Sequence, residues 1–420
     1  MAGSNHPTRF PLSLARNAGI LAFVLITLLS SWMAGSAGMA SVLSRYALAN
    51  NQVPSADAAV RLSRDNPEVR LTRAALLEAN DNQAAAVAEY EEATAMRPDD
   101  YVLWLAVARA NEISGDSSRA IAAAREAVKL APYYAEPHWQ LGNILVRAGQ
   151  SEGFRELNVA AQSNPTLMPG VIDLAWHLLK GNAKAVEDAI QPQSPASYRA
   201  LGRCFRQHEQ VDEAITMFKA AGVDAQADIQ AFVGELIAKK KYNQAFSLWS
   251  LRHGPSAPEN INDAGFEREG DLTEAGFNWR SANPQPRTCT FTLDSVNPRE
   301  GKLSLRVDFT GDSEPTTPVI SQLVLVQPLT RYRLQFSTKS ENLVSAGLPI
   351  VVVIDSNTGI VLAKSDQFAR TVSQWQDYTV DFTSGSSTTT IQIGLQREGC
   401  TSPCPIFGRV WLDAFWLRKL

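Results

Sequence analysis

The sequence predicts two structural classes in one multidomain chain, an all-α repeat solenoid followed by an antiparallel β-sandwich. Small residues, replaced once by a phenylalanine, recur at a spacing of 34 positions through the first half of the chain, in the three series Ala74, Ala108, Gly142; Ala86, Ala120, Phe154; and Ala93, Ala127, Ala161. After His253 this periodicity ends, and short segments of alternating apolar and polar residues replace it. The first pattern predicts stacked helix pairs, and the second predicts strands with one buried face.

The chain begins with a segment that is suited to a membrane. The 28 residues of 17–44 carry no charged side chain, and Ala18–Leu29 is strongly apolar. A spanning helix needs about 20 such residues. Arg9 and Arg16 lie in the leader before this run, so the positive-inside rule predicts that residues 1–16 are cytoplasmic and that the bulk of the chain is extracytoplasmic.

A cleaved signal peptide is the alternative interpretation of the same segment. A basic leader, a short apolar core and small residues at Gly35 and Ala37, or at Gly38 and Ala40, also match a signal sequence. Both interpretations place the residues after about Ser44 outside the cytoplasmic membrane. The expected location is therefore a bacterial inner membrane, with a periplasmic body and a single-pass anchor if the leader is retained.

The helical half resembles the tetratricopeptide repeat family. The residues that carry the resemblance lie in 101–134 and follow the family spacing, namely Trp104, Val107, Ala108, Asn111, Ala120, Ala124, Ala127 and Pro132. Further copies are centred on Ala74, Gly142 and Gly202, and two divergent pairs make six helix pairs in 56–253. The resemblance implies a scaffold whose concave face binds a protein partner, while the small and aromatic repeat residues pack the core.

The strand-rich half begins after a segment with two prolines and a glycine, which predicts a linker at 254–261. Eight alternating segments follow within 262–420; in Leu303–Phe309, for example, every second residue is apolar. Such a series of strands predicts an antiparallel sandwich. The predicted parts are, in order, a leader at 1–16, an anchor or signal peptide at 17–44, the solenoid at 56–253, the linker at 254–261 and the sandwich at 262–420.

The order of the motifs in 262–420 resembles the jelly-roll, galactose-binding-like carbohydrate-binding modules of xylanases and cellulases. The motifs are NDAGFE near the start, EGKLSLRVDF in the middle, and WQDYTVDF and GRVWLDAFWL toward the end. The resemblance implies a non-catalytic glycan-binding module that holds a structural calcium ion. It places Glu267 and Asp413 at the positions that supply calcium oxygens. The alternative is that these two carboxylates accept local backbone N–H groups.

Sugar binding requires exposed aromatic rings with polar neighbours. The aromatic candidates are Trp279, Trp375, Trp411 and Trp416, and the polar candidates are Gln322, Gln392 and Arg397. Trp279 and Trp375 are the selected platforms because both lie close to predicted loops. The alternative for any of these tryptophans is the sandwich core.

Four cysteines allow three complete disulfide pairings. Cys400 and Cys404 are close enough in sequence to close a short loop, and a disulfide between them fits an oxidising compartment. A zinc site is not expected, because no second cysteine pair and no histidine accompanies them.

Several classes of function are disfavoured. The net charge of -4 provides no broad basic surface for nucleic acid. All five histidines lie at or before His253, so the strand-rich half has no base for a Ser/His/Asp or Cys/His site, and the chain has no P-loop, dinucleotide fingerprint or HExxH motif.

The sequence therefore predicts a protein that is not an enzyme. We interpret it as a scaffold or adaptor of the cell envelope, similar to bacterial proteins associated with exopolysaccharide, that acts in the synthesis or export of a surface polysaccharide. The repeats bind a protein partner and the sandwich contacts glycan. The alternatives are an assembly scaffold with no sugar binding and an extracytoplasmic glycoside hydrolase, which needs only two carboxylates.

Overall fold

The computed structural model describes residues 12–254, 259–269, 271–281, 289–312, 314–401 and 403–420. The chain divides into two compact units, Met1–Gln191 and Pro192–Leu420. The first unit is helical, and the second joins four helices to the strand-rich half. The predicted fold class is confirmed, since the described residues form helical repeats followed by two antiparallel sheets.

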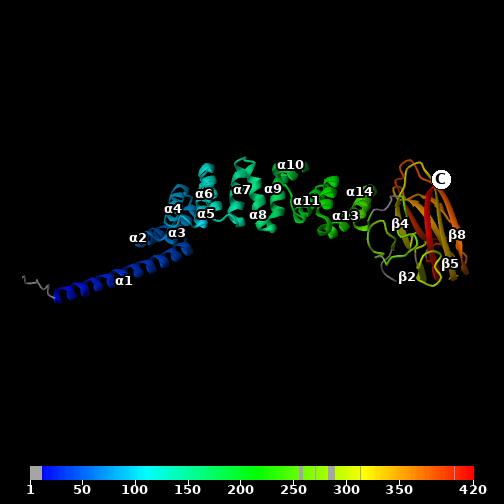
Figure 1. Cartoon of the computed structure of the whole chain (residues 1–420), viewed down its shortest axis with the longest axis horizontal. Helices are drawn as coiled ribbons and strands as arrows, with labels where there is room; N and C mark the ends of the chain where they lie inside the picture. The colour runs from blue at the N-terminus through cyan, green and yellow to red at the C-terminus, as the bar shows by residue number, and fades with distance from the viewer. Residues whose placement is uncertain (1–11, 255–258, 270, 282–288, 313, 402) are drawn as a thin grey trace, which may run out of the picture. The chain divides into compact units, whose positions relative to one another are not determined.

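The repeats between Pro67 and His253 form six antiparallel helix pairs (Figure 1). In the first unit these pairs are α3 (Pro67–Ala79) and α4 (Gln83–Met96), α5 (Tyr101–Ile113) and α6 (Ser117–Leu130), α7 (Ala135–Arg147) and α8 (Glu152–Ser163), and α9 (Met168–Leu178) and α10 (Ala183–Ile190). In the second unit they are α11 (Pro195–Gln207) and α12 (Val211–Ala221), and α13 (Gln226–Ala238) and α14 (Tyr242–His253). Two short 3-10 turns, η1 (Pro165–Leu167) and η2 (Gly222–Ala225), separate neighbouring pairs.

The repeated small residues lie where paired helices come closest. Ala74, Ala108 and Ala120 are completely buried. A side chain at Gly202 would place its Cβ 2.7 Å from the ring of Phe218, so only glycine allows α11 to approach α12 this closely. The 34-residue period therefore reflects close helix packing.

The apolar N-terminal helix continues into the solenoid. Helix α1 (Leu12–Asn50) is followed by α2 (Val53–Leu62), and the two form an additional pair before α3. Ala40 and Ala47 of α1 are fully buried in two small clusters with residues of α2 and α3, namely Ala56, Ala59, Val69 and Leu76. The large apolar residues between Ile20 and Met33 are exposed. One helix thus provides a bare apolar segment and a packed repeat segment.

The strand-rich half is a sandwich of two five-stranded antiparallel sheets. One sheet has the order β1 (Arg280–Ser281), β4 (Ile320–Leu325), β9 (Thr390–Glu398), β6 (Leu348–Asp355) and β7 (Val361–Lys364). The other has the order β2 (Cys289–Asp294), β3 (Ser304–Asp312), β10 (Pro405–Lys419), β5 (Arg331–Val344) and β8 (Val372–Thr383). Each of the eight predicted segments forms a strand, whereas the short strands β1 and β7 lie outside the predicted segments.

The core of the sandwich contains the apolar residues that alternate along these strands. Leu305, Val307 and Phe309 of β3 are buried, while Arg306 and Asp308 between them lie on the outer face. Across β10, Val410 and Leu412 point inward and Arg409 and Trp411 point outward. Figure 1 shows the long strands β5 and β8 beside each other in this sandwich.

The last helix pair packs directly on the sandwich. Phe277, 2% exposed, contacts the rings of Phe246 and Trp249 of α14 with centroid separations of 5.0 and 5.6 Å. Arg252 also pairs with Glu274 at 2.7 Å. On a second edge, the Tyr242 hydroxyl donates to the Ser356 carbonyl at 2.9 Å. The second unit is therefore one packed body from Pro192 onward, to which the last two repeats belong.

Candidate functional site

The outer face of the sheet that contains β10 carries an aromatic and charged surface. Lys339 of β5 lies between two tryptophan rings, with its ammonium 5.0 Å from the Trp375 centroid and 4.9 Å from the Trp411 centroid. We refer to Trp375, Lys339 and Trp411 as the tryptophan–lysine patch. Cation–π attraction holds the lysine there. Burial lowers the pKa of Lys339, although the nearby carboxylates of Asp294 and Asp413 act in the opposite direction.

Hydrogen bonds fix both rings of this patch. The Trp375 indole N–H donates to the Asn297 carbonyl at 3.0 Å, and the Trp411 indole donates to Asp294 Oδ2 at 2.7 Å. Burial raises the pKa of Asp294, but the hydrogen bonds from Trp411 and from the Val296 amide outweigh this and lower it overall. Both rings are half-buried, so each retains some surface for a ligand.

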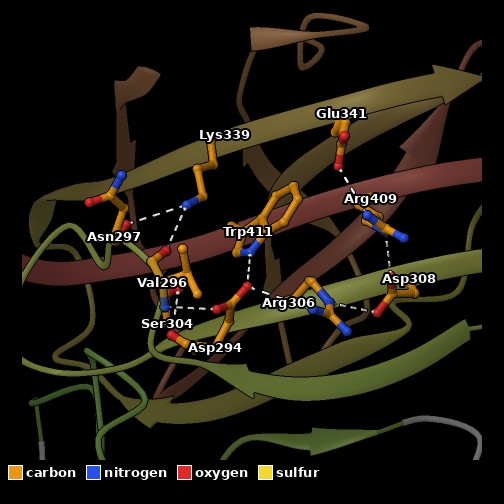
Figure 2. A network of polar contacts seen from close by, with 10 residues as sticks. All are labelled: Asp294, Val296, Asn297, Ser304, Arg306, Asp308, Lys339, Glu341, Arg409 and Trp411. Carbon is orange, nitrogen blue, oxygen red and sulfur yellow. Dashed lines mark hydrogen bonds and ion pairs between the residues drawn. The ribbon is translucent and has the colours of Figure 1, made fainter. Parts of the chain in front are cut away.

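Ion pairs extend the surface along β3, β10 and β5. Arg306 bonds Asp308 at 2.9 Å, and Arg409 bridges Asp308 at 3.0 Å and Glu341 at 3.2 Å. Figure 2 shows this network around Trp411. Charges of both signs alternate across the strands, which is a suitable arrangement for contacting the hydroxyl groups of a sugar polymer.

The other aromatic candidate, Trp279, belongs to the sandwich core. It is only 4% exposed, packs against Phe266 and Phe415, and donates its indole N–H to the Asp263 carbonyl at 3.2 Å. A buried ring has no exposed face on which a pyranose could stack, so Trp279 does not belong to the tryptophan–lysine patch. Of the remaining tryptophans, Trp416 is 52% exposed and lies under Arg418.

The polar neighbours suggested by the sequence are also largely internal. Gln322, 1% exposed, accepts the Asn262 amide and donates to the Asn262 carbonyl. Gln392 donates to Ser321, and Arg397 is 3% exposed. The structure does not bring these three side chains to the tryptophan–lysine patch. Strand parity alone could not have separated Gln392 from Trp411. Parity tells which residues of one strand share a face, but not which sheet the strand joins.

Glu267 and Asp413 do converge. A Cβ built on Gly265 would lie 3.6 Å from Asp413 Oδ1 and 3.9 Å from Glu267 Oε1. Asp413 is fully buried and accepts backbone N–H groups from Arg299, Glu300 and Ala414, while Glu267 accepts those of Lys302 and Leu303. Desolvation raises the pKa of Asp413; the amide hydrogen bonds oppose this, and the charge of Glu267 adds to it.

These contacts bear on the predicted calcium ion. Calcium takes six to eight oxygen ligands. Within the ranges that the structure describes, no group of three His, Cys, Asp or Glu residues could hold a metal. The two carboxylates would supply only part of a calcium shell, and backbone amides already donate hydrogen bonds to both of them. The calcium site therefore stays a prediction, and the structure gives its two residues a local role as acceptors.

The cysteine pair lies at one end of the sandwich. Cys400 and Cys404 form a disulfide, with a Cα–Cα distance of 6.2 Å. Cys204 lies in α11 and Cys289 in β2, far from it in sequence. The disulfide closes the loop between β9 and β10.

The sequence did not identify a candidate binding site on the solenoid, whereas the structure shows a hollow there. A hollow of about 400 Å³ lies between α4, α5 and α6, lined by Glu91, Thr94, Ala95, Pro98, Trp104, Val107, Asn111, Arg119, Ala122, Ala123 and Glu126. We call it the solenoid groove. The Trp104 indole donates to the Pro98 carbonyl at 2.8 Å, which fixes the ring in the wall. In the sequence, the only indication of this hollow was the large Trp104 side chain among small residues, and core packing explains that feature equally well.

Comparisons with known proteins find distant structural likenesses to the helical and to the strand-rich part. No family model matches the chain, and no curated relative matches it. A solved MamA fragment from Desulfovibrio magneticus RS-1 is 14% identical with a TM-score of 0.32, covering 37% of this chain and 94% of its own. PilF of Pseudomonas aeruginosa is 13% identical with a TM-score of 0.32, covering 46% and 92%. A CBM4 structure is 15% identical with a TM-score of 0.29, covering 38% and 99%. These likenesses are too distant to show function.

Asp413 provides a test of the buried carboxylate. We expect Asp413→Ala to lower the free energy of unfolding by roughly 3 kcal/mol, because it removes a buried carboxylate that accepts three part-buried backbone amides. Urea unfolding followed by tryptophan fluorescence measures the loss. Asp381→Ala, at an exposed carboxylate of the same sandwich, should change stability little.

The same proteins test calcium binding. If Glu267 and Asp413 hold calcium, about 1 mM calcium raises the melting temperature of the unaltered protein and not that of Asp413→Ala. Equal melting temperatures in calcium and in chelator would show that the calcium prediction is wrong.

Proposed function

We propose that this protein is a membrane-anchored, non-catalytic scaffold of the cell envelope that acts in the synthesis or export of a surface polysaccharide. The single observation that carries the scaffold role is the solenoid groove. Its lining is predominantly apolar between a few charged groups, a composition that excludes water well and suits an inserted side chain from a partner protein.

The charges at the groove are largely paired within the protein. Arg119 lies 3.8 Å from Glu91 and 2.8 Å from Asp116, and Lys129 lies 2.6 Å from Glu126. A partner therefore gains its affinity mainly from apolar contact with Trp104 and the alanines, while the rim selects its orientation. This arrangement supports a protein segment with an apolar anchor residue as the occupant.

Filling the groove tests this role. Ala122 is exposed and lines the groove, so Ala122→Arg should block it without removing a core side chain. A photoreactive residue at position 122 should cross-link a defined partner in membranes, and Ala122→Arg should lower recovery of that partner at least tenfold.

The matched control is Val102→Arg, which alters another exposed residue of the same region outside the groove. We expect it to leave recovery of the partner unchanged. Equal recovery with Ala122→Arg and with the unaltered protein would remove the groove from the proposal.

Retention of the N-terminal helix as a membrane anchor is part of the proposal. The helix Ile20–Asn50 has the length and composition to cross a membrane, a property that signal sequences share. Its continuation into buried positions at Ala40, Ser44 and Ala47 supports retention over cleavage after Ala40, which would remove one of these packed residues, whereas cleavage after Ala37 would leave all three. An anchor of this kind would hold the first repeat next to the membrane surface.

The N-terminus of the mature protein decides between anchor and signal peptide. We expect the intact mass of protein purified from membranes to include residues 17–37, and the protein to resist extraction with alkaline carbonate. A mature chain that begins between Ser36 and Ser41 and occurs in the soluble fraction would contradict the anchor.

A second candidate function, glycan binding by the sandwich, is supported by the tryptophan–lysine patch. Half-buried aromatic rings surrounded by paired charges combine an apolar surface for pyranose C–H groups with donors and acceptors for hydroxyls. Together with an extracytoplasmic location, such a surface would bring the scaffold to a polymer. A sandwich that binds no sugar would leave a pure assembly scaffold.

Trp375→Ala tests the patch. We expect about a tenfold loss of retention on polysaccharide affinity gels, because the substitution removes an aromatic platform and releases Lys339. The full chain in detergent is required, because α14 packs on the sandwich. Trp416→Ala, an exposed tryptophan of the same sheet, is the control.

The result of that experiment also separates the alternatives. Absence of retention on every polymer would favour the assembly scaffold, whereas release of free sugar from any polymer would indicate a glycoside hydrolase.

A further inference from the structure

A second hollow lies at the end of the sandwich that carries the disulfide. Its volume is about 550 Å³, within the range of about 300 to 1,000 Å³ that is typical of small-molecule pockets. We call it the end pocket; the lining residues that determine its chemistry are Val344, Ser345, Arg370, Cys400, Cys404 and Phe407. The patch residues Trp375, Lys339 and Trp411 do not contribute to it.

The end pocket is positively charged. Arg370 is an exposed arginine whose Nη1 and Nη2 each donate to one backbone carbonyl, those of Leu343 and Ser345, at 3.2 Å. No carboxylate of the described residues pairs with it, and none of the lining residues is acidic. Since a guanidinium has five N–H donors, Arg370 is positioned by the two carbonyls and keeps donors for a ligand.

A second arginine supports the floor of the pocket. Arg397 is 3% exposed, and its Nη1 lies 3.4 Å from Ser345 Oγ and 3.5 Å from Cys404 Sγ, both atoms of lining residues. Its guanidinium thus contacts the Ser345 hydroxyl and the Cys404 sulfur from the interior of the sandwich.

One wall of the pocket is apolar and exposed. Phe407 is 49% exposed and Val344 is 62% exposed, and the two are direct partners across β10 and β5. Core packing does not explain an exposed phenylalanine at the beginning of a strand. A flat apolar ring next to a guanidinium is a suitable surface for the C–H face of a pyranose that also carries a carboxylate.

The disulfide between Cys400 and Cys404 restrains the opposite wall. It closes a short loop whose cysteines both line the pocket, which reduces the conformational freedom that a ligand would otherwise have to remove.

We propose that the end pocket binds an acidic sugar residue of a polysaccharide, with the sugar carboxylate held by Arg370 and the sugar ring packed on Phe407. This inference rests on the glycan-binding candidate of the proposed function and specifies its ligand class as a uronic-acid polymer. It assigns recognition of the sugar carboxylate to a site separate from the tryptophan–lysine patch.

Titration calorimetry of the full chain in detergent tests the proposal, with tetragalacturonate as the probe and its methyl ester as the uncharged match. The acid should bind and the ester should bind at least tenfold more weakly, since a charge-assisted contact is lost. Arg370→Gln should weaken binding of the acid at least tenfold and Phe407→Ala several-fold, with melting curves confirming that both variants fold. Raising salt from about 50 to 500 mM should weaken binding.

Two control variants locate the site. Arg331→Gln changes an exposed arginine at the other end of β5, and Trp416→Ala changes an exposed tryptophan that does not line the end pocket; neither should affect binding of the acid. Unchanged binding in both Arg370→Gln and Phe407→Ala, equal binding of acid and ester, or no binding of tetragalacturonate would each overturn the proposal.

Loss of binding in Trp375→Ala alone would transfer recognition to the patch and overturn it as well. None of these results depends on the partner cross-linked at position 122, so failure of the end pocket is distinguishable from failure of the scaffold role.

Discussion

The fold depends on covering the apolar face that every helix pair leaves open. A repeat buries its core only against its neighbours, so the first and last repeats need another element. At the N-terminal end, α2 and the last part of α1 cover α3 with alanines such as Ala47 and Ala59. At the C-terminal end, Phe277 of the strand-rich half covers Phe246 and Trp249 of α14. The segments that look like an anchor and an accessory module therefore each cover a terminal repeat of their own unit.

This requirement explains why the functional surfaces are separate from the core. Paired helices approach each other closely at alanine and glycine residues, as at Ala108 and Gly202. These residues have no polar or aromatic side chain that could bind a ligand. Recognition is left to larger or charged side chains between them, such as Trp104 in the solenoid groove and Lys339 in the tryptophan–lysine patch. Both places are held rigid by indole hydrogen bonds, which favours binding over conformational change.

Much of the fold was predictable from the sequence, because helix pairs and strands have different periods. The 34-residue spacing located three pairs, the same internal pattern located the copy centred on Gly202, two divergent pairs completed the six, and alternation located the eight long strands. The sequence did not predict the additional pair made by α1 and α2. The apolar composition of α1 is typical of a membrane segment, although its last part has small residues like those of the repeats. For the site, a family resemblance paired Glu267 with Asp413, and the two carboxylates do converge. The sequence could not tell that Trp279 is internal, since its burial depends on ring contacts with Phe266 and with Phe415, which comes from β10.

The two hollows differ in a way that assigns them different ligands. The solenoid groove has its charges paired within the protein, so an incoming charge would have to compete with Glu91 or Asp116 for Arg119. The end pocket has an arginine that contacts only neutral carbonyls among the described residues, so an incoming carboxylate gains a contact without breaking an ion pair. An apolar protein segment therefore suits the first, and an acidic sugar suits the second. Under the two proposals, one chain would contact a protein partner and an anionic polymer through hollows of different chemistry.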